Sequence, residues 1–236
     1  MTSPLPFHMG GRETSIKRFL RKQMNDIDKD AGKSALRAAR DAAELEIPVE
    51  SARLPQFFQL LQQGITLRSQ VGCSVKSFLR CRLLLSDEFI QDKIQTIFLD
   101  GKPVDDLDTA YVKDGCTLAL SAAMPGLVGA TMRRGGYYAS LRAQISHCAE
   151  AENAPAASEG FITLKLFNFL TDLVGKKLLQ DGVFAGRRNL EDVLNRLPLS
   201  ELKGIRVFRG GKPLDWNTFR ASGSPDDMVL LRVKIS

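Results

Sequence analysis

The chain contains one eight-residue pattern twice, and this repetition constrains its fold more than any other feature. The first copy is Ile97–Val104 (IFLDGKPV) and the second is Val207–Leu214 (VFRGGKPL), 110 positions later. In each copy an apolar run leads into a glycine that can take a positive φ angle, and a proline fixes φ two residues further on. A second turn signal and a further apolar run follow each copy, at Cys116–Leu120 and Met228–Val233. Repetition at this separation predicts two related domains in tandem rather than a solenoid of short repeats.

The length and composition are those of an ordinary globular protein. Its 236 residues, 44% hydrophobic and 25% charged, are enough for two small domains with a modest core each. No apolar run approaches the roughly 20 residues needed to cross a bilayer. The first residues lack the basic head and apolar centre of a secretory signal. We therefore expect a cytoplasmic protein without a membrane span.

The net charge of +6 is spread along the chain instead of being concentrated in one segment. Nucleic-acid binding normally gathers basic side chains on one element. The charge pattern therefore gives no reason to expect a nucleic-acid partner.

Residues able to carry metal or nucleophilic chemistry are sparse. The four cysteines form no Cys-x-x-Cys pair and the chain has two histidines, so no metal site is predicted. Cys81 and Cys116 lie among apolar neighbours and are predicted to be buried, whereas Cys148 lies in a polar stretch. The three aspartates of residues 105–108 are interpreted as a solvated loop cluster, and no His-assisted nucleophile is found. We therefore expect no catalytic residue and no cofactor.

The first 50 residues are predicted to form a helical segment. Apolar residues recur at intervals of three and four between residues 16 and 27, with basic residues among them. An alanine-rich run at residues 34–45 favours a second helix, which Pro48 ends. Two interpretations stay open. The helices dock onto their own domain or a second copy, or the basic amphipathic helix meets a membrane surface or nucleic acid.

The first compact domain is predicted over residues 51–146. Two runs, Gln56–Gln62 and Ile65–Gln70, flank Gly64 and suggest a hairpin. The first run does not alternate cleanly, so a short helix there is the alternative. Ser74 is a predicted N-cap for an amphipathic helix. The strands around the repeated turn complete the order β-β-α-β-β.

A small, polar and acidic stretch, residues 147–160, is predicted to be a linker to the second domain, residues 161–236. Phe161–Phe167 alternates as a strand does, and Lys177–Phe184 is its predicted partner strand. Asn189 is predicted to cap a short helix that Pro198 ends. The core residues predicted for the two domains are Phe78, Leu79, Phe98, Leu118, Leu120, Leu164, Leu166, Val193, Leu194, Val207 and Leu230.

This order of elements, with a glycine turn after the third strand, resembles the ubiquitin-like β-grasp superfamily. Within it, the chain is most similar to the small sulfur-carrier proteins of molybdopterin and thiamine biosynthesis. The similarity is carried by Phe98–Val104 with Val112–Leu120, and by Phe208–Leu214 with Asp226–Leu230. It implies an α+β fold of two tandem β-grasp domains preceded by an α-helical segment.

The sulfur carriers act through a free C-terminal Gly-Gly tail, which an activating enzyme adenylates and which is then converted to a thiocarboxylate. The sequence ends Val233–Ser236 without glycine and so departs from that pattern. The segment Arg133-Arg134-Gly135-Gly136 follows the first predicted β-grasp domain and allows three interpretations. Cleavage after Gly136 exposes a tail, the glycines form a turn into a packed helix at Tyr137–Ile145, or the glycines and arginines cradle an anion.

We expect a non-enzymatic adaptor protein that binds a partner protein through two ubiquitin-like domains. The alternative is a sulfur carrier or protein modifier cleaved after Gly136, whose partner resembles an activating enzyme. Oligomers through the N-terminal helices are a further option. Trp216 is either a lid on its own core or an anchor for a partner. The predicted binding residues are Arg133, Arg134, Gly135, Gly136, Arg209 and Trp216, with Lys165 on the same sheet as Arg209.

Overall fold

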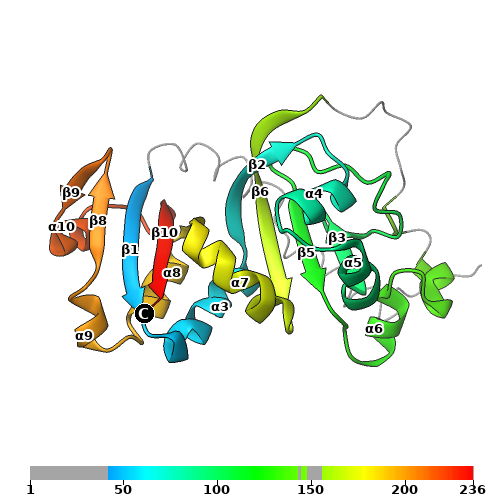
Figure 1. The fold of residues 1–236 in the computed structure, drawn as a ribbon, viewed down its shortest axis with the longest axis horizontal. Helices are drawn as coiled ribbons and strands as arrows, with labels where there is room; N and C mark the ends of the chain where they lie inside the picture. Colours follow the sequence, from blue (N-terminus) through cyan, green and yellow to red (C-terminus); the bar gives the residue numbers. More distant parts are fainter. Residues whose placement is uncertain (1–41, 143–144, 148–155, 236) are drawn as a thin grey trace, which may run out of the picture.

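A mixed sheet of ten strands runs through the molecule, which this computed structural model describes over residues 42–142, 145–147 and 156–235. The strand order across the sheet is β4-β3-β5-β6-β2-β7-β10-β1-β8-β9 (Figure 1). The strands are β1 (Ala43–Val49), β2 (Ile65–Val71), β3 (Thr96–Leu99), β4 (Lys102–Pro103), β5 (Thr117–Ser121), β6 (Ser158–Phe167), β7 (Val183–Gly186), β8 (Arg206–Arg209), β9 (Lys212–Leu214) and β10 (Met228–Ile235).

Short helices connect these strands, so the fold is mixed α+β, as predicted. Polar side chains cap several of them: Ser74 accepts a hydrogen bond from Ser77 N–H, and Ser86 accepts one from Phe89 N–H. None of the helices in the described part of the chain is long and apolar enough to cross a membrane. The helices are η1 (Ser51–Phe57), α3 (Phe58–Gln63), α4 (Val75–Cys81), α5 (Asp87–Lys93), α6 (Gly126–Met132), η2 (Tyr137–Arg142), α7 (Leu170–Asp181), α8 (Arg187–Leu194), α9 (Leu199–Leu202) and α10 (Trp216–Ala221).

The sheet has the same series of pairings when it is followed inward from either edge. Each half has, from the edge inward, an outer hairpin, an antiparallel pair, a central parallel pair and another antiparallel pair. The parallel pairs are β5 with β6 and β10 with β1. The halves meet where Thr66 of β2 pairs with Phe184 of β7. One hydrophobic core cluster contains buried residues from both halves, so the halves are held together by packing as well as by backbone pairing.

The repeated sequence pattern forms the outer hairpin of each half. Phe98 faces Pro103 in one hairpin and Phe208 faces Pro213 in the other. The two central turn residues have positive φ in both: 49° and 76° at Asp100-Gly101, and 57° and 76° at Gly210-Gly211. A two-residue turn of this kind matches the twist of the strands it joins. The two copies therefore form hairpins of the same register at opposite edges of the sheet.

One predicted strand pairing is wrong. Phe161–Phe167 does form a strand, within β6, but β6 pairs with β2 and β5 and not with residues 177–184. Most of that proposed partner belongs to helix α7, whose buried Leu170, Val174 and Leu178 recur every four residues. The chain therefore crosses from one half of the sheet to the other after β6. The chain also crosses between the halves after β1, because β1 lies between β10 and β8 whereas β2 pairs with β6.

The predicted alanine-rich helix is also wrong at its end, because residues 43–49 form β1. Ala43, Leu45, Ile47 and Val49 are buried and the residues between them are half-buried, which is the two-residue period of a strand. Residues 1–41, with the rest of the predicted helical segment, lie outside the described residues. The helical alternative for residues 56–62 is confirmed by η1 and α3.

The predicted core is largely confirmed, and the predicted linker is shorter than expected. Residues 158–160 already belong to β6, and residues 148–155 lie outside the described part of the chain. Phe98 and Leu230 are half-buried because they alternate with buried neighbours on the opposite face of the sheet. The predicted core residues that are buried are Phe78, Leu79, Leu118, Leu120, Leu164, Leu166, Val193, Leu194 and Val207.

Candidate functional site

The predicted binding residues fall into two groups at opposite ends of the sheet. Arg133–Gly136 follows α6 beside the β3–β4 edge, whereas Arg209 and Trp216 belong to β8 and α10 (Figure 1). Seven strand steps separate β3 from β8, or about 34 Å at roughly 4.8 Å per step. Lys165 is predicted to lie on the same sheet of the second domain as Arg209, but it lies on β6, in the half that contains β3. These residues therefore do not form one site.

The Arg209 and Trp216 end of the molecule is closed over its own core. Trp216 is half-buried and stacks on the fully buried Phe219 with 5.6 Å between ring centroids. The guanidinium of the buried Arg187 lies 4.2 Å from the centroid of the same Phe219 ring. This geometry favours the interpretation of Trp216 as a lid, with Arg209 exposed nearby on β8.

The α6–η2 segment, residues 126–142, is organised around the buried side chain of Arg142. Its guanidinium forms two hydrogen bonds with the Asp105 carboxylate, at 2.8 and 2.7 Å. It also donates to the carbonyl oxygens of Thr131 at 2.7 Å and Arg133 at 3.2 Å, and to Ser146 Oγ at 2.7 Å. A planar guanidinium suits such a set of acceptors. One side chain thus ties α6, η2 and the loop after β4 together.

Arg133–Gly136 forms a turn against the body of the protein. Arg134 donates its backbone N–H to Gln95 O at 2.7 Å and its guanidinium to Ile90 O at 2.9 Å. Gly135, with φ of 61°, donates its N–H to Asp105 Oδ1 at 3.3 Å. Gly136 N–H donates to Arg133 O at 3.2 Å, which closes the predicted turn. Arg133 is exposed.

The charge on Asp105 is stabilised by this arrangement. Burial raises the pKa of its carboxyl, but the hydrogen bonds and charge of Arg142, the Gly135 N–H and the charge of Arg134 outweigh burial. The pKa of Asp105 therefore lies below its usual range. Asp105 is exposed, as predicted for the aspartate cluster, and its carboxylate is in addition paired with the buried Arg142.

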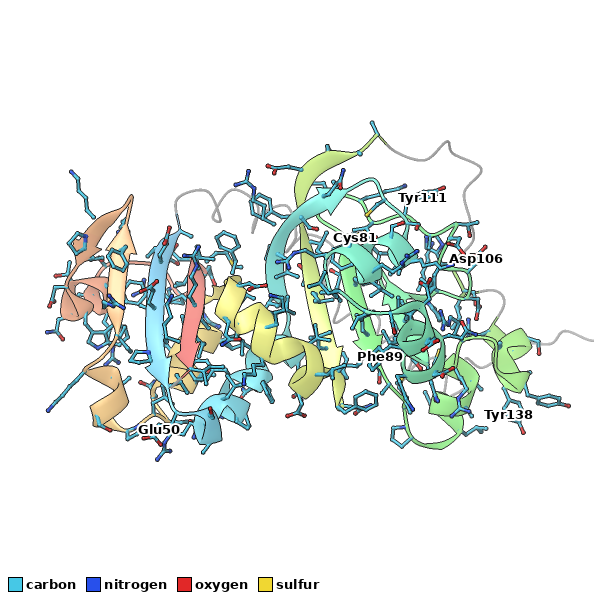
Figure 2. The ribbon with its side chains drawn as sticks, viewed as in Figure 1. Glu50, Cys81, Phe89, Asp106, Tyr111 and Tyr138 are labelled. Carbon is cyan, nitrogen blue, oxygen red and sulfur yellow. The ribbon has the colours of Figure 1, made fainter. Side chains whose placement is uncertain are left out.

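Large apolar side chains of the α6–η2 segment face solvent. The exposed fractions are 91% for Tyr137, 41% for Tyr138, 73% for Leu141 and 63% for Leu127. The two tyrosine rings meet edge to face, with 5.0 Å between centroids, and Tyr138 lies at the outer edge of the molecule (Figure 2). The predicted packing of Tyr137, Tyr138 and Leu141 is wrong because Arg142 takes the buried position of η2.

An apolar groove that the sequence did not predict lies between the α4–α5 connection and α7. It encloses about 420 Å³. Leu84, with φ of 56°, and Leu173 line it at 67% and 53% exposure. The three consecutive leucines of residues 83–85 were the available signal, because an irregular connection cannot turn all three inward. The other lining residues are Arg82, Leu83, Leu85, Ser86, Phe89, Val174, Lys177, Leu178 and Asp181.

An acidic hollow of about 670 Å³ lies on the other side of α5. Six carboxylates and two basic side chains line it, for a formal charge of −4. No group of side chains in the described part of the chain could hold a metal ion. The excess of carboxylates makes the hollow an electronegative surface. Its charged residues are Lys76, Asp87, Glu88, Asp92, Asp105, Asp106, Asp108 and Arg134.

Burial disfavours the reactive thiolate form of two of the described cysteines, Cys73 and Cys116. Burial raises the pKa of the Cys116 thiol to about 12, and burial also raises the pKa of Cys73. Cys116 is buried as predicted, but Cys81 is exposed, contrary to the prediction, since it ends α4 on the helix face turned to solvent. Cys148 lies outside the described residues.

Comparison with known proteins identifies no relative: no protein-family model, no curated protein and no solved structure matches the chain. The similarity to ubiquitin-like sulfur carriers stays a prediction from the residues that carry it.

Proposed function

We propose that this chain is a non-enzymatic, cytoplasmic adaptor built from two ubiquitin-like β-grasp units, and that its α6–η2 segment docks on a partner protein. One observation carries the proposal: Leu127, Tyr137, Tyr138 and Leu141 are exposed on a backbone that Arg142 holds in place. Exposed tyrosines on a rigid support are typical of protein interfaces because they bury a large area at a small cost in side-chain entropy.

The arrangement of the sheet supports the two β-grasp units. Each half has an outer hairpin and a central parallel pair, with α4 following β2 in one half and α8 following β7 in the other. In this proposal the units are not consecutive in the chain. Strand β6 completes the unit built from residues 65–121, and strand β1 completes the unit built from residues 183–235.

The composition of the segment indicates the chemistry of the partner. Residues 124–141 contain Arg133 and Arg134 and no acidic residue. Arg134 is engaged with Ile90 and Gln95, whereas Arg133 is exposed. The partner surface that fits is an apolar recess for the tyrosines with carboxylates at its rim.

The alternative, a sulfur carrier or modifier cleaved after Gly136, requires this turn to open. A mobile tail would have to lose the contacts of Arg134 with Gln95 and Ile90 and the contact of Gly135 with Asp105. Cleavage would also separate Arg142 covalently from the segment that it holds. These contacts favour the adaptor over the carrier and its activating-enzyme partner.

A photo-reactive amino acid at position 137 tests the proposal in the native cell. We expect a discrete crosslink to one protein, which is then purified and its affinity measured by calorimetry. Tyr137→Ser should weaken binding by about 30-fold, the effect of an interface hot spot worth about 2 kcal/mol. Lys212→Ser, an exposed change on β9 at the other end of the sheet, is the control and should bind normally.

Two results would overturn the proposal. One is equal affinity of the purified partner for wild type and Tyr137→Ser. The other is the absence of any protein crosslink together with binding to anionic lipid vesicles that is lost in Tyr137→Ser. The segment would then be a membrane-docking element.

A further inference from the structure

The groove between the α4–α5 connection and α7 is lined mainly by apolar side chains, several of them open to solvent. Val174 and Leu178 of α7 are buried against it, and Leu84 and Leu173 line it at 67% and 53% exposure. Phe89 of α5, labelled in Figure 2, also lines it. Its volume of about 420 Å³ lies in the range of small-ligand sites. Apolar side chains gathered around a hollow in this way favour an apolar occupant.

The backbone at Leu84 supports a binding role for this groove. Its φ of 56° is a conformation that leucine rarely adopts. The conformation accompanies an apolar side chain that lines the groove and stays out of the core. Unfavourable backbone conformations cluster at ligand sites, where the surrounding structure maintains them. The strained leucine is thus a second feature, besides the apolar lining, that points to a ligand.

Three charged side chains line the groove, and two of them neutralise each other. Lys177 and Asp181 form an ion pair within α7, with 3.2 Å between Nζ and Oδ2. Arg82 is half-buried and forms no ion pair with any residue in the described part of the chain. The hydroxyl of Ser86, the other polar side chain of the lining, caps α5. The groove therefore combines an apolar surface with one guanidinium that has no carboxylate.

We propose that this groove binds an aliphatic carboxylate, the chemical class of a medium-chain fatty acid. The chain lies along Val174 and Leu178 between Leu84 and Leu173, and the carboxylate accepts hydrogen bonds from Arg82. A planar guanidinium suits a carboxylate because it can donate two parallel hydrogen bonds. A methylene group is about the size of a water molecule, roughly 30 Å³, so a chain of roughly ten carbons with its carboxylate fits the groove.

The charge of the lining favours an anionic head group over the alternatives. An uncharged chain would cover Arg82 without giving its guanidinium an acceptor, and burying a charge without a partner is unfavourable. A cationic head group would be repelled by Arg82 and would find Asp181 already paired with Lys177. The inference uses a different surface from the α6–η2 segment and does not depend on the proposed function.

Calorimetric titration of the full-length protein with sodium decanoate, below its micelle concentration, tests the proposal. We expect one site with a Kd on the order of 100 µM, because methylene groups in an open groove lose only part of their contact with water. Each methylene group should contribute about two- to fourfold in affinity, so octanoate should bind about five- to tenfold more weakly. Decyltrimethylammonium has the same chain with the opposite charge and should bind at least about tenfold more weakly than decanoate.

Two variants and their matched controls assign the binding to the groove. Arg82→Gln should weaken decanoate binding by about tenfold or more and leave decyltrimethylammonium binding no weaker. Its control is Arg80→Gln on the same helix, because Arg80 pairs with Asp87 and lies outside the lining. Leu84→Asn suits the positive φ and should also weaken decanoate binding, whereas the equally exposed change Leu141→Asn on η2 should not. Circular dichroism shows that each variant is folded.

The inference is overturned if decanoate does not bind at about 1 mM, or if Arg82→Gln and Leu84→Asn bind it as tightly as wild type. Binding that starts only where decanoate forms micelles would also overturn it, because the protein would then adsorb a detergent. A further contrary result is a change in the leucine methyl NMR signals of residues 84 and 173 with protein concentration but not with decanoate. The occupant would then be a second copy of the chain.

Discussion

Replacing Arg142 with alanine should loosen the α6–η2 segment and lower the stability of the protein. The substitution removes five hydrogen bonds, two of them to the Asp105 carboxylate. It also leaves the carbonyl groups of Thr131 and Arg133 without this donor. Removing one partner of a buried ion pair typically costs about 3–5 kcal/mol. The Asp105 side chain is 42% exposed and can rehydrate, so we expect a loss of about 2–3 kcal/mol.

Urea denaturation followed by circular dichroism measures this loss. For a chain of this length, 2–3 kcal/mol corresponds to a decrease in Tm of roughly 5–10 °C. Arg142→Lys keeps the charge without the planar fork and should fall between wild type and Arg142→Ala. Arg209→Ala, an exposed control, should stay within about 0.5 kcal/mol of wild type. An Arg142→Ala protein with the stability of wild type and unchanged amide exchange in residues 126–142 would refute the reasoning.

Three further predictions concern the same framework. The pKa of Asp105 is lowered in the folded protein, so the Asp105–Arg142 pair stabilises the fold above the unfolded carboxyl pKa of about 4 and loses this effect as pH falls through the lower folded pKa. Asp105→Asn should therefore reduce the fall in the free energy of unfolding at acid pH, and an unchanged fall would contradict the assignment. Leu194→Ala, at a buried position of α8, should cost about 2–5 kcal/mol in urea denaturation, and a wild-type midpoint would count against the core assignment. Gly101→Ala places a side chain at φ of 76° and should cost about 1–2 kcal/mol; equal stability would show that the turn changes shape.

Local features of this fold could be predicted from the sequence. The paired Gly-Lys-Pro motifs require tight turns between strands, and both form hairpins of the same register. Ser74 can cap the helix that follows it because the hydrogen bond to Ser77 lies within one turn. These elements depend on neighbouring residues, so a reading of the sequence is sufficient for them.

Features that depend on distant residues could not be predicted. The alternation of Phe161–Phe167 identifies a strand but is satisfied by any partner, and the chain pairs it with β2 and β5. The periodicity of Tyr137–Ile145 indicates a helical turn without stating which side is buried. Arg142 takes the buried side because its acceptor, Asp105, lies 37 positions earlier. The groove at Leu84 likewise exists because α7 lies opposite it.

The adaptor proposal depends most on whether Gly136 stays inside the chain, and intact-mass spectrometry of the protein from its own cells measures this directly. Because Arg134 and Gly135 hold the turn to Gln95, Ile90 and Asp105, we expect a species in which residues 133–147 are covalently continuous. A fragment ending at Gly136, as a carboxylate or a thiocarboxylate, would contradict the proposal and establish the carrier alternative.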